Sequence, residues 1–222
     1  MWVAKLAMAV SGIVWGLFVL IHTVGNLKVY SGPESFNGYA HWLRAVLYPF
    51  LPREGLLWGL RIALLVALVV HVGAAAMLWR RARRARGPHR ARGTGWRSFT
   101  ARTMPVTGLA LLGFIVFHIL DLTTGTRPAA SGAFAAPALQ DSFAYENLVA
   151  SFERPWAAAV YALTMVLLAL HLLHGTMTAG IDLGAGGRTA RAALVWVGGL
   201  AAGFVLLANA SIPLAVLSGV LR

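Results

Sequence analysis

Four histidines, one in each of four long apolar segments, are the residues of this sequence best suited to chemistry. They are His22, His71, His118 and His171. A polar imidazole is costly inside a membrane, so an intramembrane histidine indicates a functional site. Imidazole nitrogens are also common metal ligands. One histidine in each of four segments therefore predicts two metal sites with two ligands each.

The composition predicts the elements that position these histidines. The chain has 222 residues, of which 59% are hydrophobic and only 12% charged. A membrane-spanning helix needs about 20 mainly apolar residues. Five stretches satisfy this requirement, at residues 5–27, 56–79, 104–124, 156–179 and 192–220. We expect an all-α integral membrane protein that forms a single transmembrane domain over residues 1–222, with its first four spans in a cofactor-binding bundle.

The charge distribution predicts the orientation in the membrane. The net charge is +12, and the 80–102 segment carries nine arginines and no acidic residue. A basic run can bind nucleic acid, but between two spans the positive-inside rule explains it more simply, so no nucleic-acid partner is expected. The 80–102 loop and the N-terminus are then cytoplasmic, and the more acidic 121–155 loop and the C-terminus lie outside.

Two short helices are predicted in the outer loops. Residues 33–43 alternate polar and bulky apolar side chains beside a membrane, which favours an interfacial helix with Tyr39 and Trp42 at headgroup level. Pro49 follows and stops regular helix. A second short helix is expected near residues 141–151.

Orientation sorts the four histidines by depth. His22 and His118 fall in the outer halves of their spans, whereas His71 and His171 fall in the inner halves. Helix rise places the two levels about 15 Å apart. The absence of cysteine excludes covalent c-type haem attachment and iron–sulfur clusters held by this chain's own thiolates. The predicted sites are therefore an outer pair and an inner pair of histidines.

The histidines could also have a purely structural role or bind zinc. Each could form only a hydrogen bond between helices, although matched depths disfavour this for all four. Zinc usually requires four ligands at one level, which two levels do not provide. For a haem ligand we expect the second ring nitrogen to be held by a backbone carbonyl or a Ser/Thr hydroxyl one turn away, with Thr23, Thr107 and Thr164 available.

Several motifs carry a resemblance to a known family. They are His22–Asn26, Glu34–His41, the run from Ser98 to Gly108, Phe117–His118 and His171–Gly175. In this order the chain resembles the cytochrome b membrane anchor of succinate:quinone oxidoreductases (succinate dehydrogenase and fumarate reductase). It is most similar to the single-chain, five-helix, two-haem branch associated with menaquinone.

The resemblance implies an electron-transfer role. A chain of this family holds two haem b groups, the outer one through His22 and His118 and the inner one through His71 and His171. The ligand of the fourth span precedes a glycine by four residues, which implies His171 rather than His174. The chain would anchor the flavoprotein and iron–sulfur subunits on the cytoplasmic side of a bacterial inner membrane and pass electrons to membrane quinone. It would perform no succinate chemistry itself.

Further candidate site residues are polar groups near the two membrane surfaces. For the haem propionates these are Arg102 and His174 on the inner side and Lys28 and Arg44 on the outer side. For a quinone headgroup they are Glu54, His41, Asn37 and Asn26 on the outer side and His174, Asp182 and Ser98 on the inner side.

The sequence also allows two alternative functions. One is a di-haem cytochrome b subunit of another quinone-linked dehydrogenase, and the second is a haem-free membrane anchor or small transporter. The sequence leaves open the physiological direction, the haem potentials, the number of quinone sites, an additional small membrane subunit and association of complexes into oligomers.

Overall fold

The structure is a computed structural model that describes residues 2–86, 96–139 and 141–222, without the side chains of residue 86 and of 96–101. Seven α-helices make up most of this part of the chain, and no strand occurs in it. They are α1 (Trp2–Asn26), α2 (Gly32–Ala45), α3 (Gly55–Arg86), α4 (Trp96–His118), α5 (Ala144–Phe152), α6 (Pro155–Asp182) and α7 (Gly187–Leu217). A 3-10 turn, η1 (Leu27–Ser31), extends α1, and a π-helical turn, η2 (Ile119–Thr123), extends α4.

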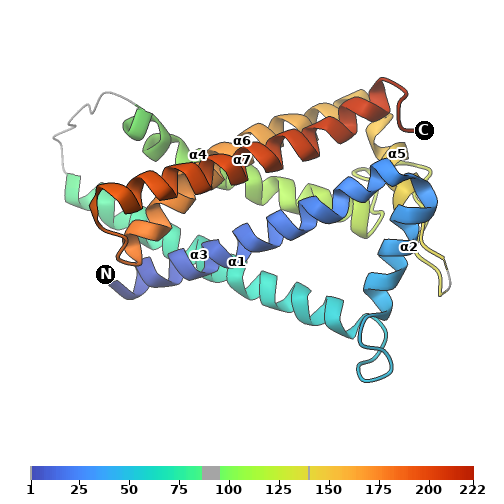
Figure 1. The fold of residues 1–222 in the computed structure, drawn as a ribbon, viewed down its shortest axis with the longest axis horizontal. Helices are drawn as coiled ribbons and strands as arrows, with labels where there is room; N and C mark the ends of the chain where they lie inside the picture. The colour runs from blue at the N-terminus through green and yellow to red at the C-terminus, as the bar shows by residue number, and fades with distance from the viewer. Residues whose placement is uncertain (1, 87–95, 140) are drawn as a thin grey trace.

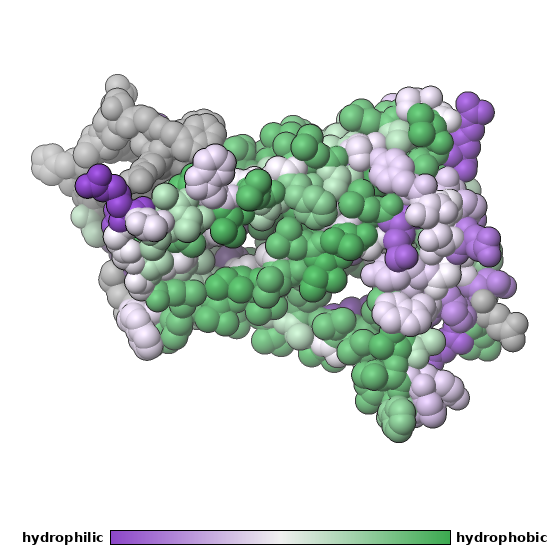
Figure 2. All heavy atoms as spheres, viewed as in Figure 1, coloured by the Kyte–Doolittle hydropathy of each residue, from purple (hydrophilic) through white to green (hydrophobic). Residues whose placement is uncertain are grey.

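Five of these helices are long and apolar enough to cross a membrane: α1, α3, α4, α6 and α7. Apolar side chains cover the middle of the molecule, and hydrophilic residues gather toward its ends (Figure 2). Large apolar residues of these helices, such as Leu109, Leu163 and Leu207, are exposed, as expected for contact with lipid. The expectation of an all-α integral membrane protein with five spans is confirmed.

The spans form a bundle in which two pairs of helices face each other diagonally. Helix α1 packs along α3 and along α6, and α6 packs along α4 (Figure 1). Helix α7 lies outside this group, against α6 and α1. The order around the bundle is therefore α3, α1, α6 and α4, which places α1 diagonally opposite α4 and α3 diagonally opposite α6.

The connections separate into two ends of the bundle. The N-terminus, the end of α3 and the turn between α6 and α7 lie at one end, which we call the basic end (Figure 1). Helices α2 and α5 and the C-terminus lie at the opposite end, which we call the loop end. Helix α2 covers the residues of the predicted interfacial helix, and α5 confirms the second short helix.

The basic segment contains more helix than expected. Helix α3 continues to Arg86, seven residues beyond its expected end, and α4 begins at Trp96, eight residues before its expected start. Alanine and arginine are good helix formers, and positive side chains stabilise the C-terminal end of a helix dipole. The hydrophobic pattern marks the length that fits the membrane, whereas the helix itself extends into water.

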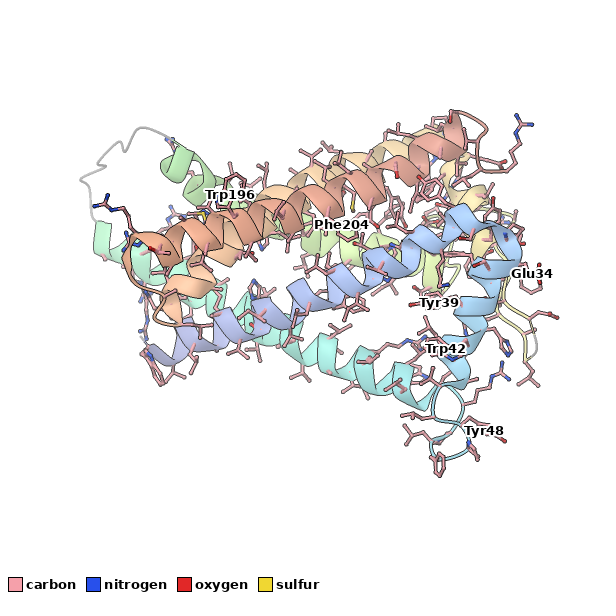
Figure 3. All side chains as sticks on the ribbon, in the orientation of Figure 1. Glu34, Tyr39, Trp42, Tyr48, Trp196 and Phe204 are labelled. Atoms are coloured by element: carbon pink, nitrogen blue, oxygen red, sulfur yellow. The ribbon has the colours of Figure 1, made fainter. Side chains whose placement is uncertain are left out.

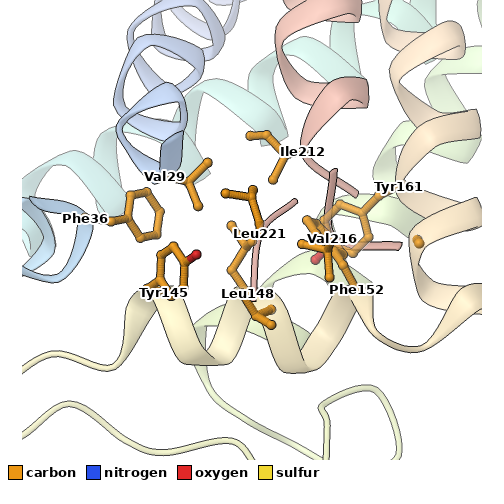
Figure 4. Packing of buried hydrophobic residues seen from close by; sticks show 11 residues of the cluster. Val29, Phe36, Tyr145, Leu148, Phe152, Tyr161, Ile212, Val216 and Leu221 are labelled. Carbon is orange, nitrogen blue, oxygen red and sulfur yellow. The ribbon is translucent and has the colours of Figure 1, made fainter. Parts of the chain in front are cut away.

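A hydrophobic cluster organises the loop end. It includes Val29, Phe36, Tyr145, Leu148 and Phe152 and also draws on the ends of α6 and α7 (Figure 4). Tyr39, Trp42 and Tyr48 project from the neighbouring α2 and the turn that follows it (Figure 3). Burial of such clusters contributes roughly 25 cal/mol per Å² of apolar area. This packing joins η1, α2 and α5 to the loop ends of α6 and α7, and α4 packs against it.

Candidate metal centre

The outer pair of histidines meets across one diagonal of the bundle. The ring centroids of His22 on α1 and His118 on α4 lie 5.9 Å apart, with an interplanar angle of 78°. Phe18 stacks on His22 at 5.3 Å, and Phe114 stacks on His118 at 5.8 Å. Each phenylalanine precedes its histidine by four residues, so the two lie on one face of their helix. The aromatic rings restrict the orientation of the imidazoles.

The inner pair meets across the second diagonal. The ring centroids of His71 on α3 and His171 on α6 lie 6.4 Å apart, with an interplanar angle of 62°. This ring contact with His71 comes from His171, and His174 lies almost one turn further along α6. The structure thus brings together the histidines that depth had grouped.

Each inner histidine contacts a hydroxyl residue and the glycine after it on a neighbouring helix, a pair of residues that we call a seat. His71 Nδ1 lies 3.2 Å from Ser11 Oγ on α1, and His171 Nδ1 lies 3.1 Å from Thr107 Oγ1 on α4. A glycine follows each hydroxyl residue and lets the ring approach: a Cβ on Gly12 would meet His71 Cε1 at 3.1 Å, and one on Gly108 would meet His171 Cε1 at 3.5 Å.

These seats belong to a repeat that was not predicted from the sequence. Ser11-Gly12, Phe18 and His22 on α1 recur 96 residues later as Thr107-Gly108, Phe114 and His118 on α4. In both helices the seat precedes the histidine by eleven residues, which is close to three helical turns and about 16 Å. Seat and histidine therefore project toward the same interior at two levels. The signal was present in the sequence as S/T-G-x5-F-x3-H.

The second ring nitrogens are held from neighbouring helices. His71 Nδ1 also lies 3.1 Å from the backbone oxygen of Met8, and His118 Nδ1 lies 3.2 Å from the hydroxyl of Tyr161. The expected kinds of partner, a backbone carbonyl and a Ser/Thr hydroxyl, are found for His71 and His171, but they lie on neighbouring helices rather than one turn away. Of the three threonines named for this role only Thr107 has it, since Thr23 and Thr164 donate to carbonyls of their own helices.

The two pairs fit a flat metal cofactor held by two histidines. Two imidazoles that share a metal through Nε2 have centroids roughly 6 Å apart, because each nitrogen–metal bond is about 2 Å. With Nδ1 engaged in His71, His118 and His171, Nε2 is the nitrogen left for a metal. Among the residues that the structure describes, no group of three or more potential ligands gathers at one point, as zinc would require.

Trp15 adds a further feature of the bundle interior. It lies between the two levels on α1, and its Nε1 is buried without a hydrogen-bond partner in the described part of the chain. A buried donor left unpaired in this way costs about 1–3 kcal/mol. A polar edge of a cofactor would satisfy it, so this atom is consistent with a group bound in the bundle.

A buried polar network next to His118 was not predicted from the sequence either. Asp121 is 1% exposed and lies in η2, one turn beyond His118. Its carboxylate accepts hydrogen bonds from Tyr161, from Ser151 and from Arg154 Nη2, the last at 2.7 Å. In the sequence, Asp121 counted only as a charge of the outer loop. The usable signal was its spacing of three residues from His118, which places both on one side of a helix.

A pocket at the loop end contains one of the quinone candidates, Glu54. It has a volume of about 290 Å³ and is lined by Arg44, Arg53, Glu54, Trp58 and residues 137–139. Glu54 receives hydrogen bonds from Arg44 Nε at 3.1 Å and Arg61 Nη1 at 3.4 Å. Its backbone is left-handed, with φ 62°, a strained conformation for a non-glycine residue.

His41 lies beside this pocket, with Nδ1 3.5 Å from Arg53 Nη2. The remaining outer candidates lie in contacts between helices. Asn26 donates to Asn209 Oδ1 of α7 at 2.9 Å, and Asn37 donates to the carboxylate of Glu146 in α5. Lys28 lies over the ring of Tyr39, 5.5 Å from its centroid.

The inner candidates lie at or near the basic end. Asp182 ends α6 and forms an ion pair with Lys5 of α1 at 2.9 Å. Arg102 lies on α4, five residues before Thr107, and His174 lies on α6. Ser98 is in the first turn of α4, and its side chain is outside the described residues.

Fold and histidine geometry together define a class: a multi-pass helical membrane protein with paired histidines at two depths. A family model described as the succinate dehydrogenase/fumarate reductase transmembrane subunit matches residues 80–208. Because the match covers more than half of the chain, the protein belongs to this family and is a membrane subunit of such an oxidoreductase. One histidine of each pair lies within the matched part. A search of curated proteins gave no match, and a search of solved structures gave none.

Proposed function

We propose that this chain is the haem b-containing membrane anchor of a succinate dehydrogenase, which passes electrons between an iron–sulfur subunit and membrane quinone. The observation that supports this most strongly is the meeting of four histidines as two pairs about 16 Å apart along α1 and α4. The family match favours this complex over another quinone-linked dehydrogenase. The setting we propose is the inner membrane of a bacterium, with menaquinone as the quinone.

The four histidines would hold two haem b groups, His22 and His118 the outer one and His71 and His171 the inner one. Held in this way, haem would supply one-electron transfer. The chain's own contribution is orientation. Ser11, Met8 and Thr107 hold Nδ1 of the inner histidines and thereby direct Nε2 toward the bundle interior.

The basic end is the proposed docking face for the iron–sulfur and flavoprotein subunits. Helix α3 ends there with exposed arginines at 80, 81, 83 and 84. The positive-inside rule places this end in the cytoplasm. Positive charge on this face would steer acidic patches of a partner and would also contact anionic lipid.

The loop-end pocket is the proposed outer quinone site. Glu54 lines it, and His41 approaches through Arg53, so a carboxylate and an imidazole are within reach of a headgroup that exchanges protons. Arg44 and Arg61 hold the Glu54 carboxylate in place. Trp58 supplies an aromatic face, which suits a flat ring.

A reduced-minus-oxidised absorption spectrum of the purified complex tests the haem part of this proposal. We expect b-type absorption and two haems per chain by extraction and quantification. Complex without haem would exclude the two-haem function and favour a haem-free anchor.

Glu54→Gln tests the quinone part. We expect quinone reduction to fall at least tenfold, because the variant loses the carboxylate that exchanges protons with the headgroup. Both haems and succinate oxidation with a soluble acceptor should be retained. Arg127→Gln, at the loop end but outside the pocket lining, is the control. Quinone reduction that is equal in the two variants would remove Glu54 from the proposed site.

A further inference from the structure

We propose that Tyr161 and Asp121 are positioning residues for His118, which link this histidine to a buried carboxylate and lower the midpoint potential of the outer haem. The inference rests on the proposed function, because it assumes that His22 and His118 hold a haem. It adds a role for two residues that lie within the matched part of the chain but outside the predicted ligand set.

The link is a chain of two hydrogen bonds. His118 Nδ1 lies 3.2 Å from the hydroxyl oxygen of Tyr161, and this hydroxyl lies 3.1 Å from Asp121 Oδ2. A tyrosine hydroxyl has one proton to donate. Because a carboxylate only accepts, that proton goes to Asp121, and the hydroxyl oxygen then accepts the Nδ1–H of His118. The chain thus assigns the proton of His118 to Nδ1 and leaves the Nε2 lone pair for a metal.

An anionic acceptor at the end of such a chain increases the electron density on the imidazole. Hydrogen bonds in series polarise one another, most strongly where water is excluded. A metal ligand whose second nitrogen donates toward a carboxylate is therefore a stronger base. A stronger donor stabilises the oxidised metal more than the reduced metal, which lowers the midpoint potential.

The carboxylate of Asp121 is held in place by its surroundings. Arg154 Nη2 lies 2.7 Å from Asp121 Oδ1, and Arg154 Nη1 donates to the backbone oxygen of Ala129 at 2.7 Å. Ser151 donates its hydroxyl proton to Asp121 Oδ2. A buried carboxylate is costly unless it is paired and hydrogen-bonded in this way. These contacts hold Oδ2 where Tyr161 can reach it.

The repeat shows that this network is specific to one of the four histidines. Position 25 on α1 corresponds to position 121 in the repeat, and it is Gly25, which carries no carboxylate. The inner histidines contact neutral groups, namely a backbone carbonyl and the hydroxyls of Ser11 and Thr107. The repeat alone would give His22 and His118 equivalent surroundings, so the Tyr161–Asp121 link makes the outer pair asymmetric.

The main competing role is structural. Asp121, Ser151 and Arg154 also join η2, the end of α5 and the start of α6, and Tyr161 packs on Phe152 with ring centroids 4.8 Å apart. A purely structural network would affect stability and leave the potentials unchanged. The midpoint potential is therefore the deciding measurement.

The test is a redox titration of both haems in the purified complex of the wild type and of Tyr161→Phe. The phenylalanine keeps the ring packing and the Asp121–Arg154 ion pair, so we expect a folded complex with two haems. The outer haem should shift to a more positive midpoint potential, and the inner haem should keep its wild-type value. His22→Ala identifies the outer haem as the redox transition that it loses. Tyr145→Phe, in the same hydrophobic cluster but toward Phe36 (Figure 4), is the matched control and should shift neither.

Asp121→Asn removes the charge and should shift the outer haem further in the same direction, whereas Asp121→Glu should restore part of the wild-type value. Unchanged potentials in both Tyr161→Phe and Asp121→Asn complexes with two haems would overturn this inference and leave the proposed function intact. Lowered thermal stability with unchanged potentials would assign the network a structural role only. A wild-type complex without haem would instead remove the proposed function and this inference together.

Discussion

Single glycines and hydroxyls determine how closely the inner histidines approach the neighbouring helices. At Gly12 the imidazole of His71 comes within 3.1 Å of where a Cβ would stand, and at Gly108 the corresponding distance to His171 is 3.5 Å. The first distance is tighter than ordinary packing, and the second is an ordinary van der Waals contact. Two seats with the same sequence pattern thus differ in how much space they leave.

This difference predicts unequal effects of the same substitution. Gly12→Ala should displace His71 and cost about 1–3 kcal/mol through overpacking, so the inner haem content should fall severalfold. Gly108→Ala should retain wild-type haem content, because the added methyl fits and alanine favours helix. Haem per chain, measured by extraction after purification, checks both. Equal losses of haem in the two variants would show that the two glycines do not act by leaving space for the imidazoles.

Single substitutions also distinguish His171 from His174 as the ligand of the inner haem. His171→Ala should lose the inner haem, because it removes the ring that faces His71. His174→Ala should keep both haems. The reduced-minus-oxidised spectrum distinguishes the variants by the amplitude of b-type absorption. Loss of a haem from His174→Ala alone would reverse the ligand assignment.

Among the elements, α7 is tied to α1 by a polar contact next to the outer pair. Asn209 Nδ2 donates to Thr23 Oγ1 at 2.8 Å and to its own helix at Val205, while Asn209 Oδ1 accepts from Asn26. Thr23 is 1% exposed and directly follows His22. The contact therefore fixes the rotation of α1 at the level of the outer histidine.

Asn209→Ala should destabilise the bundle by about 1–2 kcal/mol, since hydrogen bonds between membrane helices contribute roughly 0.6 kcal/mol each and at most about 1.7. Thermal loss of haem absorbance in detergent measures this. Ser211→Ala, which removes an exposed contact with Tyr30 and a bond to the Ala208 carbonyl of its own helix, is the control and should lower the transition much less. A lowering as large in Ser211→Ala as in Asn209→Ala would contradict the role given to the α1–α7 contact.

The sequence predicted the helices better than the side-chain contacts between them. Hydropathy identified five spans, and counting residues along oriented spans grouped His22 with His118 and His71 with His171. The partners of Nδ1 could not be predicted in this way, because they come from neighbouring helices and depend on helix rotation. Asp121 looked like a loop residue, because only the π-helical turn η2 turns it into the interior beside Tyr161. The repeat is hard to recognise because each copy has only four residues and the two copies are 96 positions apart. Only the fold brings them to equivalent places.

For the whole molecule, charge is segregated to the basic end. Replacing Arg80, Arg81, Arg83 and Arg84 together with glutamine should weaken attachment of the iron–sulfur and flavoprotein subunits. Because exposed charges are screened by salt, the loss should be greatest when membranes are washed at raised ionic strength. The retained succinate dehydrogenase activity of washed membranes is the measurement. Retention equal to that of Arg127→Gln would assign these arginines to topology and lipid contact alone.

The central claim is that the two diagonals of the bundle each hold one haem. Haem content and redox spectra of four single variants, His22→Ala, His71→Ala, His118→Ala and His171→Ala, test it most directly. We expect His22→Ala and His118→Ala to lose the same haem and His71→Ala and His171→Ala to lose the second haem, with one haem left in each. Four variants that keep two haems, or losses that pair His22 with His71, would contradict the arrangement proposed for this protein.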